Sequence, residues 1–130
     1  MSYSDTMKGF TLIELLIAIS IIGMLAAISI FGLQGARESG RDSKRKADIE
    51  SIRSALEIYR ADCGSYPANV TGGAPIDGTG SCAGNTYMEE VPFDPDGVTE
   101  YNYTNGGPTQ YTICATLEHN GPVVYCVDNP

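Results

Sequence analysis

Basic residues are absent from the second half of the chain. Residues 61–130 contain nine Asp and Glu but no Lys or Arg, and the 130-residue chain has a net charge of −8. Because an acidic surface repels the phosphates of nucleic acids, we expect no direct nucleic-acid contact. The seven Lys and Arg of residues 37–60 are mixed with five Asp and Glu. Such a mixture is typical of a solvated helix face.

Histidine is nearly absent as well. The single one, His119, precedes an Asn-Gly pair typical of a turn, so no catalytic triad is predicted and we expect the chain not to be an enzyme. No C-x-x-C pair occurs, and the cysteines therefore do not predict a zinc site. An even number of cysteines in a small, loop-rich module favours two disulfides and an oxidising compartment, with buried free thiols as the alternative. The four are Cys63, Cys82, Cys114 and Cys126.

Proline does not occur before Pro67, and residues 10–33 carry no charge except Glu14. As a helix rising about 1.5 Å per residue, this segment is long enough to cross a hydrocarbon core of about 30 Å. Its length and the lack of an A-x-A-like cleavage site argue against a secretory signal peptide, and the lack of a nearby cysteine argues against a lipoprotein signal. We therefore predict a single-pass transmembrane helix that stays in the protein.

Residues 34–64 continue this helix in amphipathic form. Opposite charges lie three or four residues apart, for example Asp42 with Lys46 and Glu50 with Arg53. The pattern predicts one uninterrupted helix of about 50 residues, apolar in its first half and amphipathic in its second. Apolar side chains at helical spacing predict its buried face, made of Ile49, Ile52, Leu56 and Tyr59.

Residues 65–130 are rich in Gly, Pro, Asn and Asp and predict a head of loops and short strands. Two β-rich runs, residues 110–118 and 122–127, flank the turn signal at Asn120 and predict a hairpin. The predicted fold is therefore α+β, with a long N-terminal α-helix packed on a small C-terminal antiparallel β-sheet.

The predicted hairpin also bears on the cysteines. Folding the chain about Asn120 sets Cys114 opposite Cys126, within disulfide reach. Of the three possible pairings, the one containing this bond leaves Cys63 for Cys82. We favour that pairing, which would tie the end of the helix to the loops of the head.

The stretch KGFTLIELL, residues 8–16, resembles the class III signal of type IV pilins and type II secretion pseudopilins. Its parts are ordered and spaced: a short polar leader, Gly9 before Phe10, and Glu14 four residues further on. The likeness continues through the apolar helix into the charged one. A weaker likeness joins VPFDPDG, which precedes two tyrosines, to a loop of major pseudopilins. The resemblance implies a pilin-like fold.

The resemblance also implies roles for the N-terminal residues. A prepilin peptidase is expected to cut between Gly9 and Phe10, removing the leader of residues 1–9, and to methylate the new amine of Phe10. Glu14 is expected to pair with the Phe10 ammonium of a neighbouring subunit during filament assembly. An unpaired carboxylate in a spanning helix costs on the order of a few kcal/mol, which such a pair would relieve. The alternative is a carboxylate that snorkels to the headgroups.

The implied partners are other copies of this chain, the prepilin peptidase, an inner-membrane assembly platform and minor pilins. The precursor would lie in the cytoplasmic membrane with its head outside, and the assembled filament would be periplasmic or extracellular. The positive-inside rule points the other way, because one lysine precedes the apolar run and five cations follow it between residues 37 and 46. The oxidising compartment favoured by the cysteines supports an outside head, which we predict.

Three functions remain open at this point. The first is a structural subunit of a type IV pilus-like filament, favoured by the two cysteine pairs and the C-terminal hairpin. The alternative is a major-type pseudopilin of a type II secretion system, favoured by the small head and the DPDG sequence of residues 94–97. The third is a membrane-anchored binding module that does not polymerise.

The acidic residues Asp94, Asp96 and Glu100 have the look of a cation loop. The family likeness adds that related pseudopilins bind calcium in this neighbourhood. The spacing of an EF-hand is absent, however. We expect an acidic turn in water, with calcium at these residues as the minor alternative.

Overall fold

The computed structural model describes residues 9–129. The predicted leader lies outside the described residues except for Gly9. The chain divides between Ala36 and Arg37 into two compact units, an N-terminal helical unit and a C-terminal head, which are described separately.

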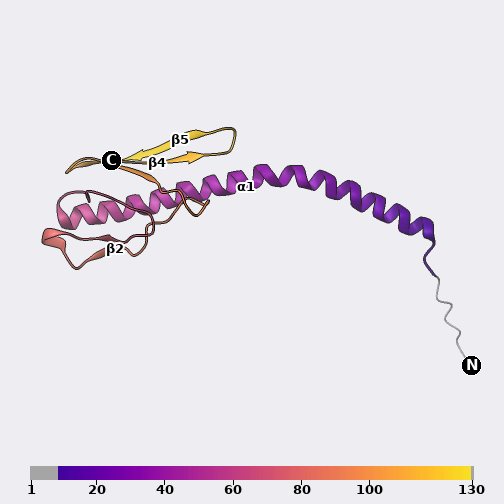
Figure 1. Ribbon diagram of the computed structural model, residues 1–130, viewed down its shortest axis with the longest axis horizontal. Helices are drawn as coiled ribbons and strands as arrows, with labels where there is room; N and C mark the ends of the chain where they lie inside the picture. Colours follow the sequence, from indigo (N-terminus) through magenta and orange to yellow (C-terminus); the bar gives the residue numbers. More distant parts are fainter. Residues whose placement is uncertain (1–8, 130) are drawn as a thin grey trace, which may run out of the picture. The chain divides into compact units, whose positions relative to one another are not determined.

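A single helix, α1 (Leu12–Cys63), runs for 52 residues and belongs to both units (Figure 1). It confirms the predicted helix of about 50 residues. The helix ends at Cys63, and the next residue, Gly64, has φ +80° and donates its N–H to the Arg60 carbonyl at 2.8 Å. This left-handed conformation favours glycine, so the stop signal is local.

The N-terminal unit exposes the apolar part of α1. The large apolar side chains that the structure describes in this segment are exposed, for example Phe10 at 88% and Leu33 at 51%. By length and composition α1 could cross a membrane, with a mean hydropathy of 2.6 over its most apolar 18 residues, none of which is buried. Apolar surface on this scale favours a non-aqueous environment or a neighbouring apolar surface.

The head contains two antiparallel sheets, one of two strands in the order β1-β2 and one of three in the order β3-β4-β5. Figure 1 shows β4 and β5 alongside the C-terminal half of α1. This arrangement confirms the predicted α+β fold. The strands are β1 (Ile76–Asp77), β2 (Thr86–Met88), β3 (Asn102–Gly107), β4 (Gln110–Leu117) and β5 (Val123–Asp128), with a 3₁₀ turn η1 (Gly80–Cys82) between β1 and β2.

The predicted hairpin is formed by β4 and β5. Its turn contains Asn120 at φ 65° and Gly121 at φ 98°, the left-handed conformations that an Asn-Gly pair adopts readily. The strand register places Cys114 opposite Cys126, and these two residues form a disulfide with their Cα atoms 4.1 Å apart. Cys63 and Cys82 form the second disulfide, with a Cα separation of 5.2 Å. Both predicted pairings are confirmed.

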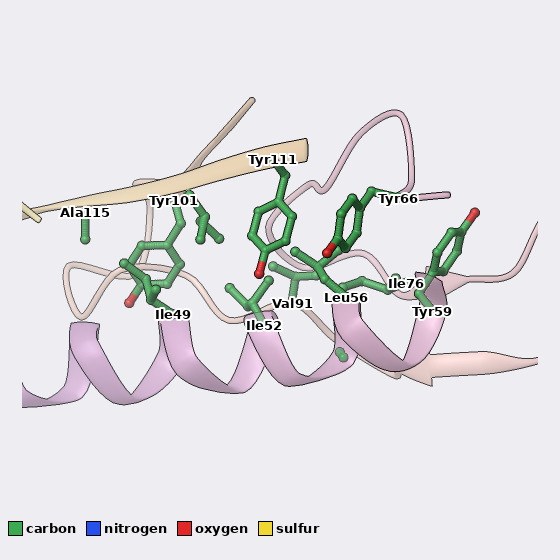
Figure 2. Close-up of a cluster of buried hydrophobic side chains, with 12 residues drawn as sticks. Ile49, Ile52, Leu56, Tyr59, Tyr66, Ile76, Val91, Tyr101, Tyr111 and Ala115 are labelled. Atoms are coloured by element: carbon green, nitrogen blue, oxygen red, sulfur yellow. The ribbon is translucent and has the colours of Figure 1, made fainter. Parts of the chain in front are cut away.

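The core of the head lies between α1 and the three-stranded sheet (Figure 2). Ile49, Ile52 and Leu56 are each 0% exposed and form the helix side of the core together with Tyr59. Tyr111 and other residues of the sheet side cover them, as Figure 2 shows. The predicted buried face of the helix is therefore confirmed. The sheet side and the loops contribute Tyr66, Ile76, Val91, Tyr101, Tyr111, Ile113 and Ala115.

Tyrosines supply much of this core and keep their hydroxyls hydrogen-bonded. Tyr111 packs edge-on against Tyr66, with ring centroids 4.6 Å apart. The Tyr101 hydroxyl donates to Asp48 at 2.8 Å, and that of Tyr66 donates to Glu57 at 2.9 Å. A buried phenol with a satisfied hydroxyl combines apolar burial with a directional bond. These contacts make the tyrosines part of the packing between α1 and the sheet.

This packing predicts alkaline unfolding. Burial raises the pKa of Tyr103 to about 12, and burial also raises the pKa values of Tyr101 and Tyr111 above that of a free tyrosine. Between about pH 10, where unfolded tyrosine ionises, and these higher values, the unfolded chain loses protons that the folded head retains. The free energy of unfolding must therefore fall as the pH rises above about 10.

Absorbance at 295 nm can follow this titration, because the chain has eight tyrosines and no tryptophan. We expect a separate late phase that coincides with the loss of the sheet's circular dichroism. In urea with the disulfides reduced, all tyrosines should instead titrate together near pH 10. Complete ionisation near pH 10 with the circular dichroism unchanged would contradict the prediction.

Candidate assembly site

Glu14 lies in the first turn of α1, where it forms a capping box with Thr11. Its Oε2 accepts the Thr11 N–H at 2.9 Å and the Thr11 hydroxyl at 2.8 Å, and its own N–H donates to the Thr11 Oγ1 at 3.3 Å. This reciprocal pattern satisfies backbone donors that a helix start leaves unpaired. Sequence reasoning missed Thr11, although the T-x-x-E spacing signals such a box.

The capping box leaves Glu14 available for a further contact. Both bonds from Thr11 fall on Oε2, so Oε1 can accept from a second donor. Glu14 and Phe10 are both exposed. In the uncut chain the Phe10 nitrogen belongs to a peptide bond, and an ammonium arises there only after cleavage. The predicted pairing therefore requires both processing and a second copy of the chain.

Gly9 has no structural reason to be glycine. A Cβ built on it meets no atom within 4 Å, and its φ is outside the left-handed region. It is exposed and lies three residues before Leu12, the first residue of α1. The described structure therefore does not require glycine at this position, and the cleavage after Gly9 stays a prediction.

The acidic loop between β2 and β3 binds a guanidinium of the same chain. Asp94 is only 7% exposed, and its two oxygens accept from Arg45 of α1, Oδ2 from Nε at 2.6 Å and Oδ1 from Nη2 at 2.8 Å. The hydrogen bonds from Arg45 to Asp94 and the charges around it raise the pKa of the Arg45 guanidinium above its usual range. The pair is a buried, bidentate ion pair.

Two further carboxylates contact Arg45. Its Nη1 donates to Asp42 Oδ1 at 2.7 Å, and its Nη2 bonds Glu118, which also pairs with Arg41. Asp42 accepts the backbone N–H groups of Glu118 and His119 at 2.9 and 2.8 Å. Burial acts to raise the pKa of Asp42, but these N–H groups and Arg45 together outweigh it and hold the pKa below its ordinary value.

Asp96 belongs to a tight turn of the same loop. Its Oδ1 accepts the N–H groups of Val98 and Thr99, both at 2.8 Å, and its Oδ2 accepts the Thr99 hydroxyl. The Thr99 hydroxyl, followed by the two N–H groups, lowers the pKa of Asp96 to about 2. The Gly97 N–H donates to the Asp94 carbonyl at 2.8 Å and closes the turn. The expected acidic turn is therefore present.

The minor alternative, calcium at Asp94, Asp96 and Glu100, does not fit these contacts. The carboxylate oxygens of Asp94 and Asp96 already accept from donors of the chain, and Glu100 is exposed. Within residues 9–129 no group of three or more His, Cys, Asp or Glu could hold a metal ion. The pairing of Asp94 with Arg45 could not be predicted from the sequence, because the two residues are distant in the chain.

An exposed apolar helix that starts at a Gly-Phe-Thr-x-x-Glu segment and continues as the spine of a small disulfide-linked sheet defines a pilin-like protein. Comparison with known families supports this class and narrows it. Residues 6–30 match the prokaryotic N-terminal methylation motif, and residues 33–121 match protein G of the type II secretion system. The chain belongs to the type II secretion system protein G family.

Curated relatives agree with the family match. The type II secretion system core protein G of Pectobacterium carotovorum subsp. carotovorum is 32% identical over 115 residues, which cover 77% of this chain and 68% of the relative. That of Pseudomonas aeruginosa is 31% identical over 127 residues, covering 88% and 87%. That of Vibrio cholerae is 31% identical over 120 residues, covering 87% and 81%. No solved structure matches the chain.

Proposed function

We propose that this chain is the major pseudopilin of a type II secretion system, the repeated subunit of a short fibre that works in protein secretion. The observation that carries the proposal is the match of residues 33–121 to protein G of that system. From the sequence alone, a type IV pilus subunit is the first hypothesis for the function and the pseudopilin is the second. The relatives, all core G proteins of type II secretion, reverse that order.

The proposed mechanism follows from the exposed helix. As a precursor, the chain is anchored in the cytoplasmic membrane by the apolar part of α1, with its disulfide-linked head in the periplasm. A prepilin peptidase cuts after Gly9 and methylates Phe10. When an assembly platform lifts the subunit out of the lipid, its apolar side chains are covered by the same segments of neighbouring copies. Minor pseudopilins are the expected partners at the start of the fibre.

Glu14 sets the position of each subunit in this proposal. Its carboxylate pairs with the Phe10 ammonium of a neighbour, and in an apolar bundle a charge is tolerated only with its partner. A subunit displaced along the axis would leave both charges unpaired. The proposed function is structural, and the single His119 lies in the hairpin turn, where its backbone N–H donates to Asp42.

Intact mass and N-terminal sequencing of membrane-extracted protein test the class. We expect the chain to start at a methylated Phe10. Gly9→Leu should block this processing and leave the head folded, since a Cβ added at Gly9 meets no atom within 4 Å. A wild-type protein that retains Met1 would contradict the proposal.

Deletion of the gene separates the two filament functions. For a pseudopilin we expect secreted enzymes to accumulate in the periplasm, with secretion restored by the wild-type chain and not by Gly9→Leu. Long surface fibres built from this chain, with secretion unaffected, would instead favour the pilus subunit.

A further inference from the structure

One buried cation joins three separate parts of the head. Arg45, on α1, is 3% exposed. Its guanidinium contacts Asp42 on the same helix, Asp94 in the loop before β3, and Glu118 in the turn after β4. In many small domains a bound calcium ion holds the oxygen ligands of an acidic loop together.

We infer that Arg45 is the built-in cation of this head, and that the head reaches its full stability without calcium. The inference concerns the head alone and is independent of the proposed role in secretion. It rests on the geometry of the donors, on the charge balance around them and on their burial.

The donor geometry already engages the carboxylates of Asp94 and Asp96 with donors of the chain. Calcium takes about six to eight oxygen ligands at about 2.3–2.6 Å. Both oxygens of Asp94 lie within 2.8 Å of Arg45 nitrogens, and both oxygens of Asp96 accept from Val98 and Thr99. Coordination by Asp94 would require Arg45 to leave, because a guanidinium and a divalent ion repel each other. Arg45 and calcium are therefore alternatives at this site.

The charge balance supports the same conclusion. Arg41 and Arg45 face the carboxylates of Asp42, Asp94 and Glu118, so the five groups carry a net charge of about −1. The side chains of the buried pair Arg45 and Asp94 are only 4% and 9% exposed. Without Arg45, Asp42 and Asp94 would be buried and lack their cation, an arrangement that is strongly destabilising.

Thermal unfolding of the full-length chain in detergent tests the inference. The chain is measured in EDTA and in about 5 mM CaCl2, above the dissociation constants of weak extracellular calcium sites of about 10⁻⁴–10⁻³ M. We expect the Tm of the wild-type chain to agree within about 1 °C in the two buffers, since a ligand that does not bind does not stabilise. An increase of several degrees in calcium would overturn the inference.

Three variants separate the role of Arg45 from general charge effects. Arg45→Met keeps the length of the side chain and removes the cation, and we expect its Tm in EDTA to fall by at least about 10 °C. Lys44→Met removes one charge from the adjacent exposed position and should change the Tm by less than about 3 °C. Arg45→Lys keeps the charge but lacks the planar guanidinium that bonds Asp94 through two nitrogens. Its Tm should lie between those of the other two variants. Equal Tm values for Arg45→Met and Lys44→Met would also overturn the inference. If Arg45→Met does not fold, the Tm of Arg45→Lys is compared with that of Lys44→Met instead.

Discussion

Replacement of Glu14 by Gln is expected to remove the chain from fibres while leaving it in the membrane with a folded head. Gln at this position still accepts from Thr11, so the capping box and the helix start are preserved. The charge is lost, and the Phe10 ammonium of the neighbour is left unpaired in an apolar bundle. Removing one partner of a buried ion pair costs about 3–5 kcal/mol. We therefore expect incorporation to fall by at least about 100-fold.

The matched control is Thr11→Ala, which removes the capping side chain and keeps the Glu14 charge. Loss of an N-cap costs about 0.5–2 kcal/mol at the helix end, and the helix continues for 52 residues, so fibre incorporation should stay near the wild-type level. Both variants are compared by quantitative mass spectrometry of the sheared fibre fraction against the membrane fraction. The reverse result, with Thr11→Ala excluded and Glu14→Gln incorporated, would make capping the function of Glu14 and contradict the pairing.

Elements encoded by neighbouring residues could be predicted from the sequence. The absence of proline and the helical spacing of apolar residues predict α1. The glycine that follows its last residue has the left-handed φ that stops the helix. The Asn-Gly turn set the β4–β5 register, and that register placed Cys114 opposite Cys126. Each of these features depends on contacts between residues close in the chain. The N-terminal motif is equally local, but pilins and pseudopilins share it, so it could not decide between them.

Contacts between distant residues could not be predicted in the same way. Asp42 was expected to pair with Lys46, but it pairs with Arg45, while Lys46 lies over the Tyr125 ring. The predicted pair of Glu50 and Arg53 does form, at 3.5 Å. Arg45 looked like one charge among many on a solvated face. Its burial depends on Asp94 and Glu118, which are 49 and 73 residues away.

The short sheet of β1 and β2 was missed for a related reason. β1 has two residues and β2 has three, too few to show an alternating pattern. Ile76 of β1 is nevertheless 3% exposed and belongs to the core. Ile76 belongs to the same buried cluster as Leu56 and Tyr59 of the helix face, which are distant in the chain and leave no local pattern.

The core of the head makes the second large prediction, which compares two isoleucines on one helix. Ile52 is 0% exposed and Ile58 is 56% exposed. Ile52→Ala removes buried methyl groups and leaves a cavity between α1 and the sheet, so the free energy of unfolding should fall by about 2–5 kcal/mol. Since small domains are stable by about 5–15 kcal/mol, this loss is a large share of the total.

Ile58→Ala makes the same chemical change at an exposed position and should cost no more than about 0.5 kcal/mol. Urea unfolding of the full-length chain in detergent, with the disulfides intact and tyrosine fluorescence as the signal, measures both variants. The slope of the free energy against urea should be the same in each, because the surface exposed on unfolding is unchanged. Equal losses at the two positions would mean that this helix face does not form the core. If Ile58→Ala folds as stably as expected, a fibre defect of this variant would report a contact of the exposed Ile58 with another subunit.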